Sequence, residues 1–278
     1  MRVLRRLTAN LAVVLALTAG PLATAAPADT TGPSTAPAGP RVFRGWALDT
    51  CTAPALDTLA AWYDTTHYRA LGIYVGGHAR ACAQPRLDRS WVAGADRAGW
   101  GLLPLYVGSQ PPCVTADTKQ EYLIDSEDPR AQARHEAADA VRKARALGIA
   151  QGSPLYLDME HYDSTDSECV HTVLEFTRQW TRSVHAAGYL SGFYSSADSG
   201  IRSLAAARRQ GQGDLPDVVW FARWNGERTL DEPLLRPDEW HPHRRIHQYA
   251  GDIRETHGGH TLLIDRNMVD APVAVVGS

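Results

Sequence analysis

The chain has 278 residues, of which 44% are hydrophobic, 21% charged and 8% aromatic. This composition is typical of a globular protein and excludes low-complexity, disordered and coiled-coil chains. The formal charge is −3, and the only two lysines are Lys119 and Lys143. Because no run of lysines and arginines could follow a phosphate backbone, we expect no nucleic-acid partner.

Residues 1–25 have the pattern of a secretory signal peptide. Three arginines within the first six residues precede an apolar run at 11–17, and small residues at 23–25 form a cleavage site. The apolar run is too short for a permanent membrane span, which needs about 20 residues. We therefore expect a secreted, monomeric protein without a membrane span, located outside the cell or in the cell envelope.

The export route is predicted from the residues that follow the first arginines. Arg5 and Arg6 are paired, as in a twin-arginine signal, but the next residues, Leu-Thr-Ala, match that signal poorly. The sequence therefore favours ordinary (Sec) secretion. Cleavage after Ala25 would leave 253 residues with 25 basic and 31 acidic side chains, and a formal charge of −6.

Residues 26–40 are predicted to form a flexible linker. They consist almost entirely of alanine, proline, threonine, glycine and serine, a composition that buries too little apolar surface to offset the entropy of ordering. No second linker of this kind follows. Residues 41–278 are therefore expected to form a single domain, whose size suits an α/β barrel better than two ordinary domains.

All four cysteines lie in the part of the chain expected to be exported. Their even number and the oxidising compartment predict two disulfides, and no close pair suggests a metal site. Three pairings are possible. Pairing of neighbours in chain order is favoured, which joins Cys51 to Cys82 and Cys113 to Cys169.

Short apolar strands alternate with longer helical segments along the domain. The clearest helices are 130–147 and 169–187, each followed by a glycine that is typical of a helix end. Alternation of this kind indicates parallel strands joined by helices, and eight strands in about 250 residues predict a (β/α)₈ barrel of the TIM type. A doubly wound sheet is the alternative. The expected strands are 43–49, 70–76, 101–107, 154–160, 189–194, 218–224, 246–250 and 262–265.

Acidic residues lie at the ends of several predicted strands. On the fourth strand Asp158 and Glu160 share one face, while Asp49 ends the first strand and Asp265 the last. Only a closed barrel brings these ends to one mouth, which is why the barrel is preferred to the doubly wound sheet. Because four carboxylates cannot all stay ionised there at low cost, we expect one, Glu160, to have a raised pKa and to act as a general acid.

Structural roles are the alternatives for these acids. A single aspartate at a strand end, such as Asp49, often caps the following loop. Asp158 and Glu160 could form an ion pair with Arg223 or Arg266. Asp265 could belong to a turn with its neighbours Arg266 and Asn267.

Aromatic side chains near the same strand ends could stack on sugar rings. Trp220 and Trp224 share one face of their strand, and Trp220 is expected in the interior while Trp224 could line a cleft. Gln248 could bind a sugar hydroxyl or acetamide, or else satisfy a loop carbonyl. The candidates for substrate binding are Asp49, Asp265, Tyr74, Tyr194, Trp224, Gln248 and Tyr249, with Tyr106 and Tyr156 as further aromatics.

The sequence lacks the motifs of a metal site and of a serine hydrolase. His241, His243 and His247 suggest an exposed loop and the start of a strand, since no His-Glu-x-x-His helix is present. Ser195 and Ser196 follow a strand without the Gly-x-Ser-x-Gly elbow of a serine hydrolase. We therefore expect neither a metal nor a cofactor.

Six segments taken together resemble the secreted actinobacterial glycoside-hydrolase-like proteins of domain-of-unknown-function family 1906. That family is in turn similar to the family 25 lysozymes, which are (β/α)₈-like barrels that cut peptidoglycan. Those lysozymes have an Asp on the first strand, an Asp-x-Glu on the fourth and an Asp on the last. The resemblance extends from about residue 43 to 272, and the segments are DTCTAP at 49–54, IYVGG at 73–77, LYLDME at 155–160, GFYSS at 192–196, VWFARW at 219–224 and HQY at 247–249.

The resemblance implies roles for the four acids. Glu160 would protonate the glycosidic oxygen, and Asp158 would orient a substrate N-acetyl group or stabilise the cationic sugar centre. Asp49 and Asp265 would bind substrate or set the pKa of their neighbours. The leading hypothesis is thus a glycosidase acting on a cell-wall polysaccharide such as peptidoglycan. The alternative is a non-catalytic carbohydrate-binding protein of the cell envelope, and a purely structural envelope protein has least support.

Overall fold

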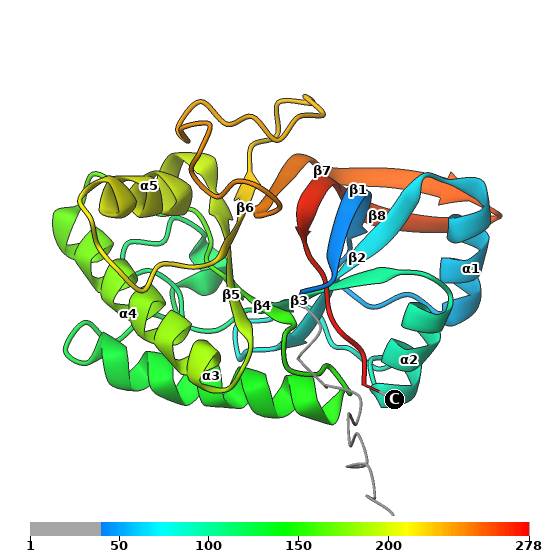
Figure 1. Cartoon of the computed structure of the whole chain (residues 1–278), viewed down its shortest axis with the longest axis horizontal. Helices are drawn as coiled ribbons and strands as arrows, with labels where there is room; N and C mark the ends of the chain where they lie inside the picture. The colour runs from blue at the N-terminus through cyan, green and yellow to red at the C-terminus, as the bar shows by residue number, and fades with distance from the viewer. Residues whose placement is uncertain (1–39, 278) are drawn as a thin grey trace, which may run out of the picture. The chain divides into compact units, whose positions relative to one another are not determined.

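Eight strands close into a barrel in which each strand pairs with its neighbours in chain order (Figure 1). The computed structural model describes residues 40–277, so the expected signal peptide and nearly all of the expected linker lie outside the described residues. The predicted α/β barrel of the TIM type is confirmed. Its strands are β1 (Val42–Asp49), β2 (Tyr68–Gly76), β3 (Gly101–Tyr106), β4 (Pro154–Asp158), β5 (Leu190–Ser196), β6 (Val218–Ala222), β7 (Arg245–His257) and β8 (His260–Pro272).

Within the described residues five α-helices lie outside the barrel, and the two long ones begin and end within two residues of their predicted bounds. Asp128 caps α3 by accepting a hydrogen bond from the backbone N–H of Ala131, and Asp166 caps α4 in the same way. Gly148 and Gly188, with φ of +81° and +84°, follow their ends. Figure 1 shows α3 and α4 side by side, with α1 and α2 at the other end of the molecule. The helices are α1 (Leu56–Thr65), α2 (Arg89–Arg97), α3 (Pro129–Ala146), α4 (Ser167–Ala186) and α5 (Arg202–Arg209).

The last strand departs from the predicted all-parallel arrangement. β8 runs antiparallel to both β7 and β1, whereas all other neighbouring strands are parallel. Gly258 and Gly259, both with positive φ, form the turn between β7 and β8. A two-residue connection reverses the chain and permits only antiparallel pairing, so the prediction of a parallel final strand is wrong.

Large side chains fill the barrel, and the polar ends of the aromatic ones have hydrogen-bond partners. The Trp220 indole N–H donates to Asn267 Oδ1 at 2.7 Å, and Tyr156 donates to the carbonyl of Pro272 at 2.9 Å. Both rings are fully buried, and they meet edge to face with centroids 5.5 Å apart. The predicted interior position of Trp220 is confirmed, and the packed interior forms a solid floor beneath the mouth.

Two disulfides fix the loops around the mouth, in the predicted pairing. Cys51 and Cys82 join the segment after β1 to the segment after β2. Cys113 and Cys169 join the segment after β3 to the first turn of α4. Because each bond closes a long chain loop, both restrict the unfolded chain and stabilise the fold.

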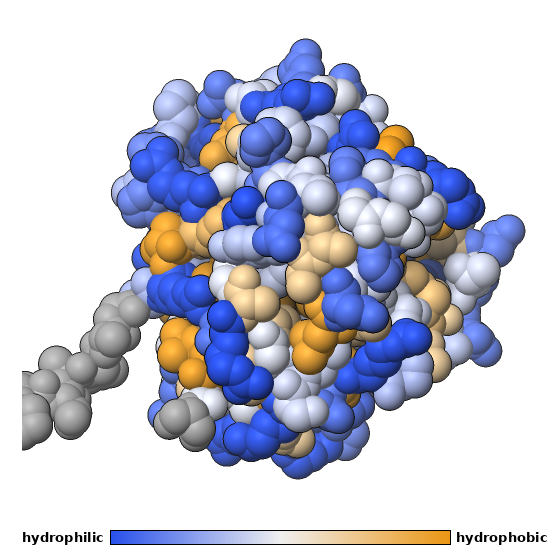
Figure 2. Space-filling model, turned by 90° about the vertical axis from the view of Figure 1, so that its right-hand side faces the viewer, coloured by the Kyte–Doolittle hydropathy of each residue, from blue (hydrophilic) through white to orange (hydrophobic). Residues whose placement is uncertain are grey.

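The surface of the described residues is polar with dispersed apolar side chains. Figure 2 shows one face on which hydrophobic residues form separate spots among hydrophilic ones. Within residues 40–277, no helix has the length and apolar character needed to cross a membrane.

Candidate functional site

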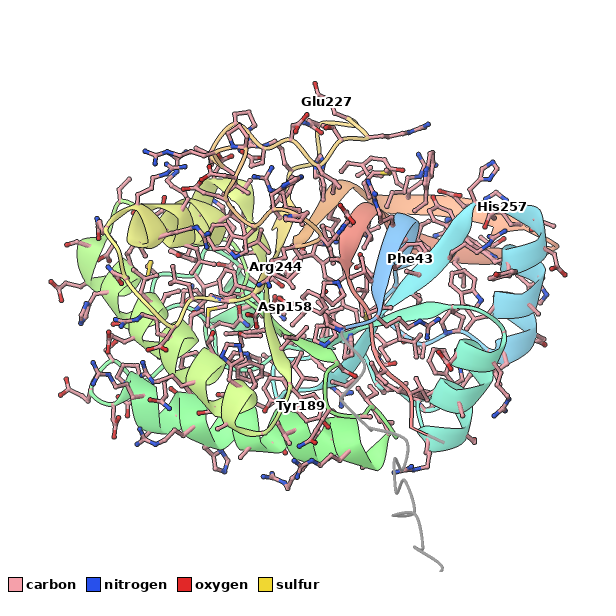
Figure 3. The ribbon with its side chains drawn as sticks, viewed as in Figure 1. Phe43, Asp158, Tyr189, Glu227, Arg244 and His257 are labelled. Carbon is pink, nitrogen blue, oxygen red and sulfur yellow. A yellow bond between two sulfur atoms is a disulfide. The ribbon has the colours of Figure 1, made fainter. Side chains whose placement is uncertain are left out.

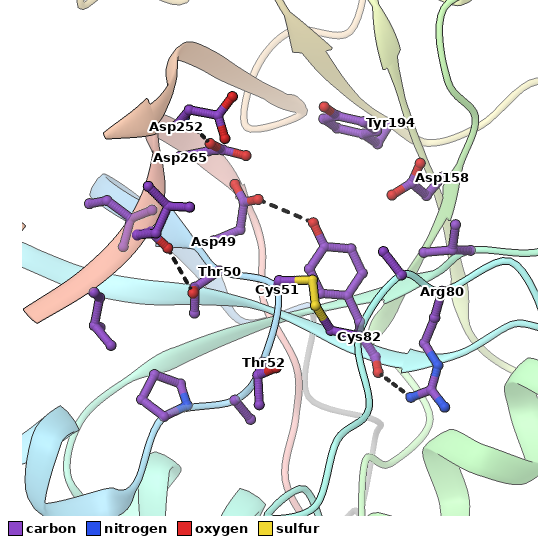
Figure 4. A pocket seen from close by; sticks show the side chains of 18 of the residues that line it. Asp49, Thr50, Cys51, Thr52, Arg80, Cys82, Asp158, Tyr194, Asp252 and Asp265 are labelled. Carbon is purple, nitrogen blue, oxygen red and sulfur yellow. Dashed lines mark hydrogen bonds between the residues drawn. A yellow bond between two sulfur atoms is a disulfide. The ribbon is translucent and has the colours of Figure 1, made fainter. Parts of the chain in front are cut away.

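The four predicted carboxylates converge on one open cavity of about 770 Å³ at the mouth of the barrel. Asp49 ends β1, Asp158 ends β4, and Glu160 lies two residues further along the chain. Figure 3 shows Asp158 near the centre of the molecule, and Figure 4 shows how Asp49, Asp158 and Asp265 lie around the cavity. The predicted convergence of the acids is confirmed.

Asp265 reaches the mouth by a different route from the predicted one. It lies within β8 rather than at its end, directly opposite Asp49 in the antiparallel pairing of β1 with β8. Because β8 runs in the reverse direction, its first half, rather than its end, lies at the mouth. Its Oδ1 accepts a hydrogen bond of 2.7 Å from the backbone N–H of Asp252, which fixes the carboxyl.

Asp49 is a buried carboxyl within a hydrogen-bonded cluster. Its oxygens accept hydrogen bonds from Tyr74 at 3.2 Å, Gln248 at 3.1 Å and Asn267 at 2.8 Å. Burial, and then the charge of Asp265, raise the pKa of Asp49 from 3.8 to about 7, although the three donors lower it. The pair formed by Asp49 and Asp265 therefore retains a proton close to neutral pH.

Asp158 differs from Asp49 because its buried carboxyl has an unsatisfied oxygen. Oδ1 has no hydrogen-bond partner among the described residues. Burial raises the pKa of Asp158 well above its usual value, and the nearby Glu160 raises it further, while Lys119 lowers it. An unpartnered buried oxygen that lines a cavity is available to a ligand.

Glu160 has more exposed surroundings than the three aspartates. Its side chain is 37% exposed, and its Oε1 lies 3.7 Å from the ammonium nitrogen of Lys119. Burial raises the pKa of Asp49, Asp158 and Asp265, the three carboxyls that lie deeper in the cavity. The position of Glu160 at the open side of the cavity is the one from which a side chain can reach a large substrate.

The structural alternative for Asp158 and Glu160, an ion pair with Arg223 or Arg266, does not form among the described residues. Arg223 binds Glu232, with Nε 2.7 Å from Oε2, and Arg266 binds Glu255 at 2.6 Å. These arginines hold other carboxylates, so they leave the acids of the cavity accessible.

Gln248 connects the acids to the aromatic side chains and has no polar atom left for a sugar. Its Oε1 accepts hydrogen bonds from Tyr194 and from Trp224, both at 2.9 Å. Its Nε2 donates to Asp49 at 3.1 Å and to Asp265 at 3.3 Å. The amide therefore positions four side chains, and the structure does not place it as a direct substrate ligand.

Of the four aromatic residues predicted to bind substrate, three line the cavity and one does not; the further candidates Tyr106 and Tyr156 are buried and do not line it either. Tyr74, Tyr194 and Trp224 contribute to its wall. The Trp224 side chain lies over Gly251, where a Cβ would come within 2.0 Å of the indole, and the residue is 57% exposed. Tyr249 is buried away from the cavity, because it follows Gln248 and side chains alternate along a strand.

Residues 60–269 match the family of Rv2525c-like, glycoside hydrolase-like domains. The chain belongs to this family. No curated protein gives a significant match to the chain. The family match covers every strand from β2 to β7 and most of β8, and therefore includes Asp158, Glu160, Gln248 and Asp265.

Solved structures share the fold of this family member. The Tat-secreted protein Rv2525c of Mycobacterium tuberculosis, in complex with L-tartrate, is 16% identical with a TM-score of 0.56, over 82% of this chain and 96% of that one. The modular autolysin LytC of Streptococcus pneumoniae, in complex with a synthetic peptidoglycan ligand, is 13% identical with a TM-score of 0.52. That match covers 81% of this chain and 46% of LytC. At these identities the likeness shows a shared fold.

Sequence reasoning missed the basic residues of this family member's cavity. Arg80, Arg86 and Lys119 line it together with the acids, and so does Asp252. Lys119 carried a signal, since it is one of only two lysines in the chain and lies in a loop between a strand and a helix. Arg80 and Arg86 flank Cys82 and could have been placed at the mouth once that cysteine was paired with Cys51.

The change Asp158→Asn should make the protein more stable at alkaline pH. Asparagine has the shape of the protonated acid, and the side chain of Asp158 makes no hydrogen bond that would be lost. An acid with a raised pKa holds its proton in the folded state and releases it on unfolding, so its stabilising effect is complete below about pH 4 and declines as pH rises. The free energies of unfolding of variant and wild type should agree at pH 4 and diverge by pH 8, as measured by urea titration.

The exposed Asp163 offers a control with the opposite sign. Hydrogen bonds from Thr165 lower its pKa, so its contribution is present above pH 4 and is lost in acid. Asp163→Asn should therefore be less stable than wild type at pH 8. If the free energies of unfolding of Asp158→Asn and wild type changed with pH in the same way, the raised pKa of the buried Asp158 carboxyl would be contradicted.

Proposed function

We propose that this protein is a glycosidase that hydrolyses a cell-wall glycan such as peptidoglycan, with Glu160 as the proton donor. The observation that carries the proposal is the unsatisfied buried oxygen of Asp158, which lines an open cavity within two residues of Glu160. Structural aspartates are normally hydrogen-bonded when buried, so this oxygen is best explained by a substrate that completes its bonding. The likeness in fold to LytC, solved with a peptidoglycan ligand, supports this class of substrate.

The reaction requires a proton at the leaving oxygen and negative charge near the anomeric carbon. Glu160 would transfer its proton to the glycosidic oxygen as the bond from that oxygen to the anomeric carbon breaks. Asp158 would accept a hydrogen bond from the N–H of a substrate N-acetyl group, which orients the acetamide, or, in its ionised form, would stabilise the cationic centre directly. Water then adds its hydroxyl to the anomeric carbon and returns a proton to a carboxylate, so that atoms and charge balance.

Asp49 and Asp265 would act on the site through their shared proton. Their pair lies beside Tyr74 and Gln248 at one side of the cavity, and it can bind sugar hydroxyls at its edge. Because the pair holds a proton near neutral pH, it limits the total negative charge around Asp158.

Trp224 is proposed as a stacking surface for a sugar ring. Trp224→Ala should raise KM about tenfold with a smaller effect on kcat, because stacking is lost in the ground state and the transition state alike. The change Trp224→Phe keeps an aromatic face but removes the N–H that binds Gln248, so it should retain most of the affinity. Michaelis kinetics on soluble glycan fragments measure both, and equal KM values for Trp224→Ala and wild type would contradict this role.

The protein is proposed to act outside the cytoplasm as a monomer, on cell-wall polysaccharide. Its two disulfides support an oxidising compartment. The sequence favours ordinary secretion, but the relative Rv2525c is described as Tat-secreted. This finding favours the twin-arginine route, for which Arg5 and Arg6 would supply the recognition pair.

The proposal is tested by incubating the purified protein with purified peptidoglycan and measuring the release of reducing ends. Fragments identified by mass spectrometry should carry a new reducing sugar at the cleaved bond. Absence of release from peptidoglycan and from other wall polysaccharides would overturn the proposal. The non-catalytic alternative is favoured by the position of Lys119 close to Glu160, and it predicts saturable binding of the same glycans without cleavage.

A further inference from the structure

Three cations share the cavity with the carboxylates, and the proposed glycosidase reaction does not use them. Arg80 and Arg86 lie between β2 and α2, and Lys119 ends a short turn between β3 and α3. We propose that these three residues, here called the basic wall, bind a carboxylate carried by a sugar of the substrate. The inference rests on the proposed function and specifies its substrate class as an acidic glycan, one with a free carboxylate near the reacting bond.

Arg80, in the basic wall, has a donor that no described group satisfies. Arg80 donates through Nη1 to the carbonyl of Tyr74 at 3.0 Å, but its buried Nε has no partner. Elsewhere the arginines Arg209 and Arg223 bind carboxylates within 3 Å. Neither Arg80 nor Arg86 has such an ion pair within residues 40–277. A buried guanidinium N–H without an acceptor is costly, so a ligand oxygen would be bound favourably there.

Lys119 also keeps donors available. Its side chain is only 10% exposed, which is unusual for an ammonium group without a close carboxylate. The nitrogen donates to the carbonyl of Ala79 at 2.8 Å, while Glu160 lies at 3.7 Å, beyond a hydrogen bond. An ammonium group has three donors, so it can bind a ligand carboxylate while it keeps its bond to the backbone.

The segment that carries the arginines is held in place. Cys82 is bonded to Cys51, and Gln84 binds the carbonyl of Cys51 at 2.6 Å and the N–H of Ala53 at 2.9 Å. Ordering of this kind before binding lowers the entropic cost of recognising a ligand. Arg80 is therefore part of a prepared site, while Arg86 lines the cavity as an exposed side chain.

Two of the carboxylates of the cavity, Asp252 and Asp265, lie away from the basic wall, which gives the substrate a direction. Figure 4 shows Arg80 on the opposite side of the cavity from Asp252 and Asp265. A glycan carboxylate is attracted to the basic wall and repelled by Asp252 and Asp265. The glycan therefore binds favourably in the one orientation that places its carboxylate against the basic wall. A neutral glycan has no group that could compensate the cations.

The test compares two ligands that differ only in charge. Sulfur-linked tetrasaccharides of alternating N-acetylglucosamine and N-acetylmuramic acid resist glycosidases, and they can be made with the carboxyls intact or reduced to alcohols. Isothermal titration should show that the wild-type protein binds the acidic form at least about tenfold more tightly than the reduced form. Raising the salt concentration should weaken binding of the acidic form alone.

Variants identify the residues responsible for this preference. Arg80→Gln and Arg86→Gln should each lose most of the preference for the acidic form, and Arg134→Gln, an exposed change on α3, should keep it. Arg86 is exposed, so its variant carries the test even if Arg80→Gln fails to fold.

Equal affinity of the wild type for both ligands would overturn the proposed role of the basic wall. Binding needs no turnover, so a charge preference without peptidoglycan cleavage would refute the glycosidase alone, and cleavage without a preference would refute the basic wall alone.

Discussion

The change Glu160→Gln is expected to lower kcat for peptidoglycan cleavage by about 10²- to 10⁴-fold. Glutamine keeps the size of the side chain and can still accept a hydrogen bond, but it has no proton to give to the leaving oxygen. The thermal unfolding temperature should change little, because Glu160 is part-exposed and its nearest cation lies 3.7 Å away. Reducing-end release measures the loss, and the exposed change Glu127→Gln serves as the control.

The role of Glu160 as an acid, rather than as a nucleophile, is tested by the leaving group. In an activated aryl glycoside the leaving group is a stable phenolate, which departs without being protonated. Cleavage of such a substrate therefore does not need a general acid. The loss caused by Glu160→Gln should therefore be much smaller with this substrate than with peptidoglycan. An equal loss with both substrates would contradict protonation of the leaving group as its function.

The strands and long helices could be predicted because each has a local signal. Apolar runs bounded by polar residues indicate β4 and β6, and capping aspartates and following glycines indicate α3 and α4. The direction of β8 was mispredicted, although its signal was present. Gly258 and Gly259 between two alternating segments are typical of a hairpin turn, and such a turn indicates the antiparallel pairing of β7 with β8.

The site was predictable in part, because strand alternation determines which side chains share a face. It correctly placed Asp158 at the cavity, Trp220 in the interior and Trp224 at the cavity wall. It could not assign burial to individual carboxyls, because burial depends on loops packed from elsewhere in the chain. For the same reason the sequence did not predict that burial raises the pKa of Asp49, Asp158 and Asp265.

The change Gln248→Glu should strongly destabilise the protein at neutral pH. The change replaces the amide group that donates to Asp49 and to Asp265 by an oxygen that cannot donate when ionised. It thereby places a third carboxyl group directly against these two aspartates. Loss of hydrogen bonds to charged groups costs about 1.5 to 3 kcal/mol each, so the free energy of unfolding should fall by about 3 kcal/mol or more. Urea titration at pH 7 measures this fall, and the exposed change Gln210→Glu is the control.

The pH dependence separates charge repulsion from lost hydrogen bonding at Gln248. Because the pKa of Asp49 is about 7, the folded protein keeps a proton there that the unfolded chain releases above pH 4. The free energy of unfolding should therefore decline as pH rises from 4 to 8, and a third carboxyl should make this decline steeper. Gln248→Met loses the same hydrogen bonds without adding an acid, so Gln248→Glu should be the less stable of the two at pH 8, and that difference should narrow towards pH 4. If Gln248→Glu and Gln248→Met were equally stable throughout this range, a carboxyl at position 248 would not interact with the two aspartates, and the proton that they share would need another explanation.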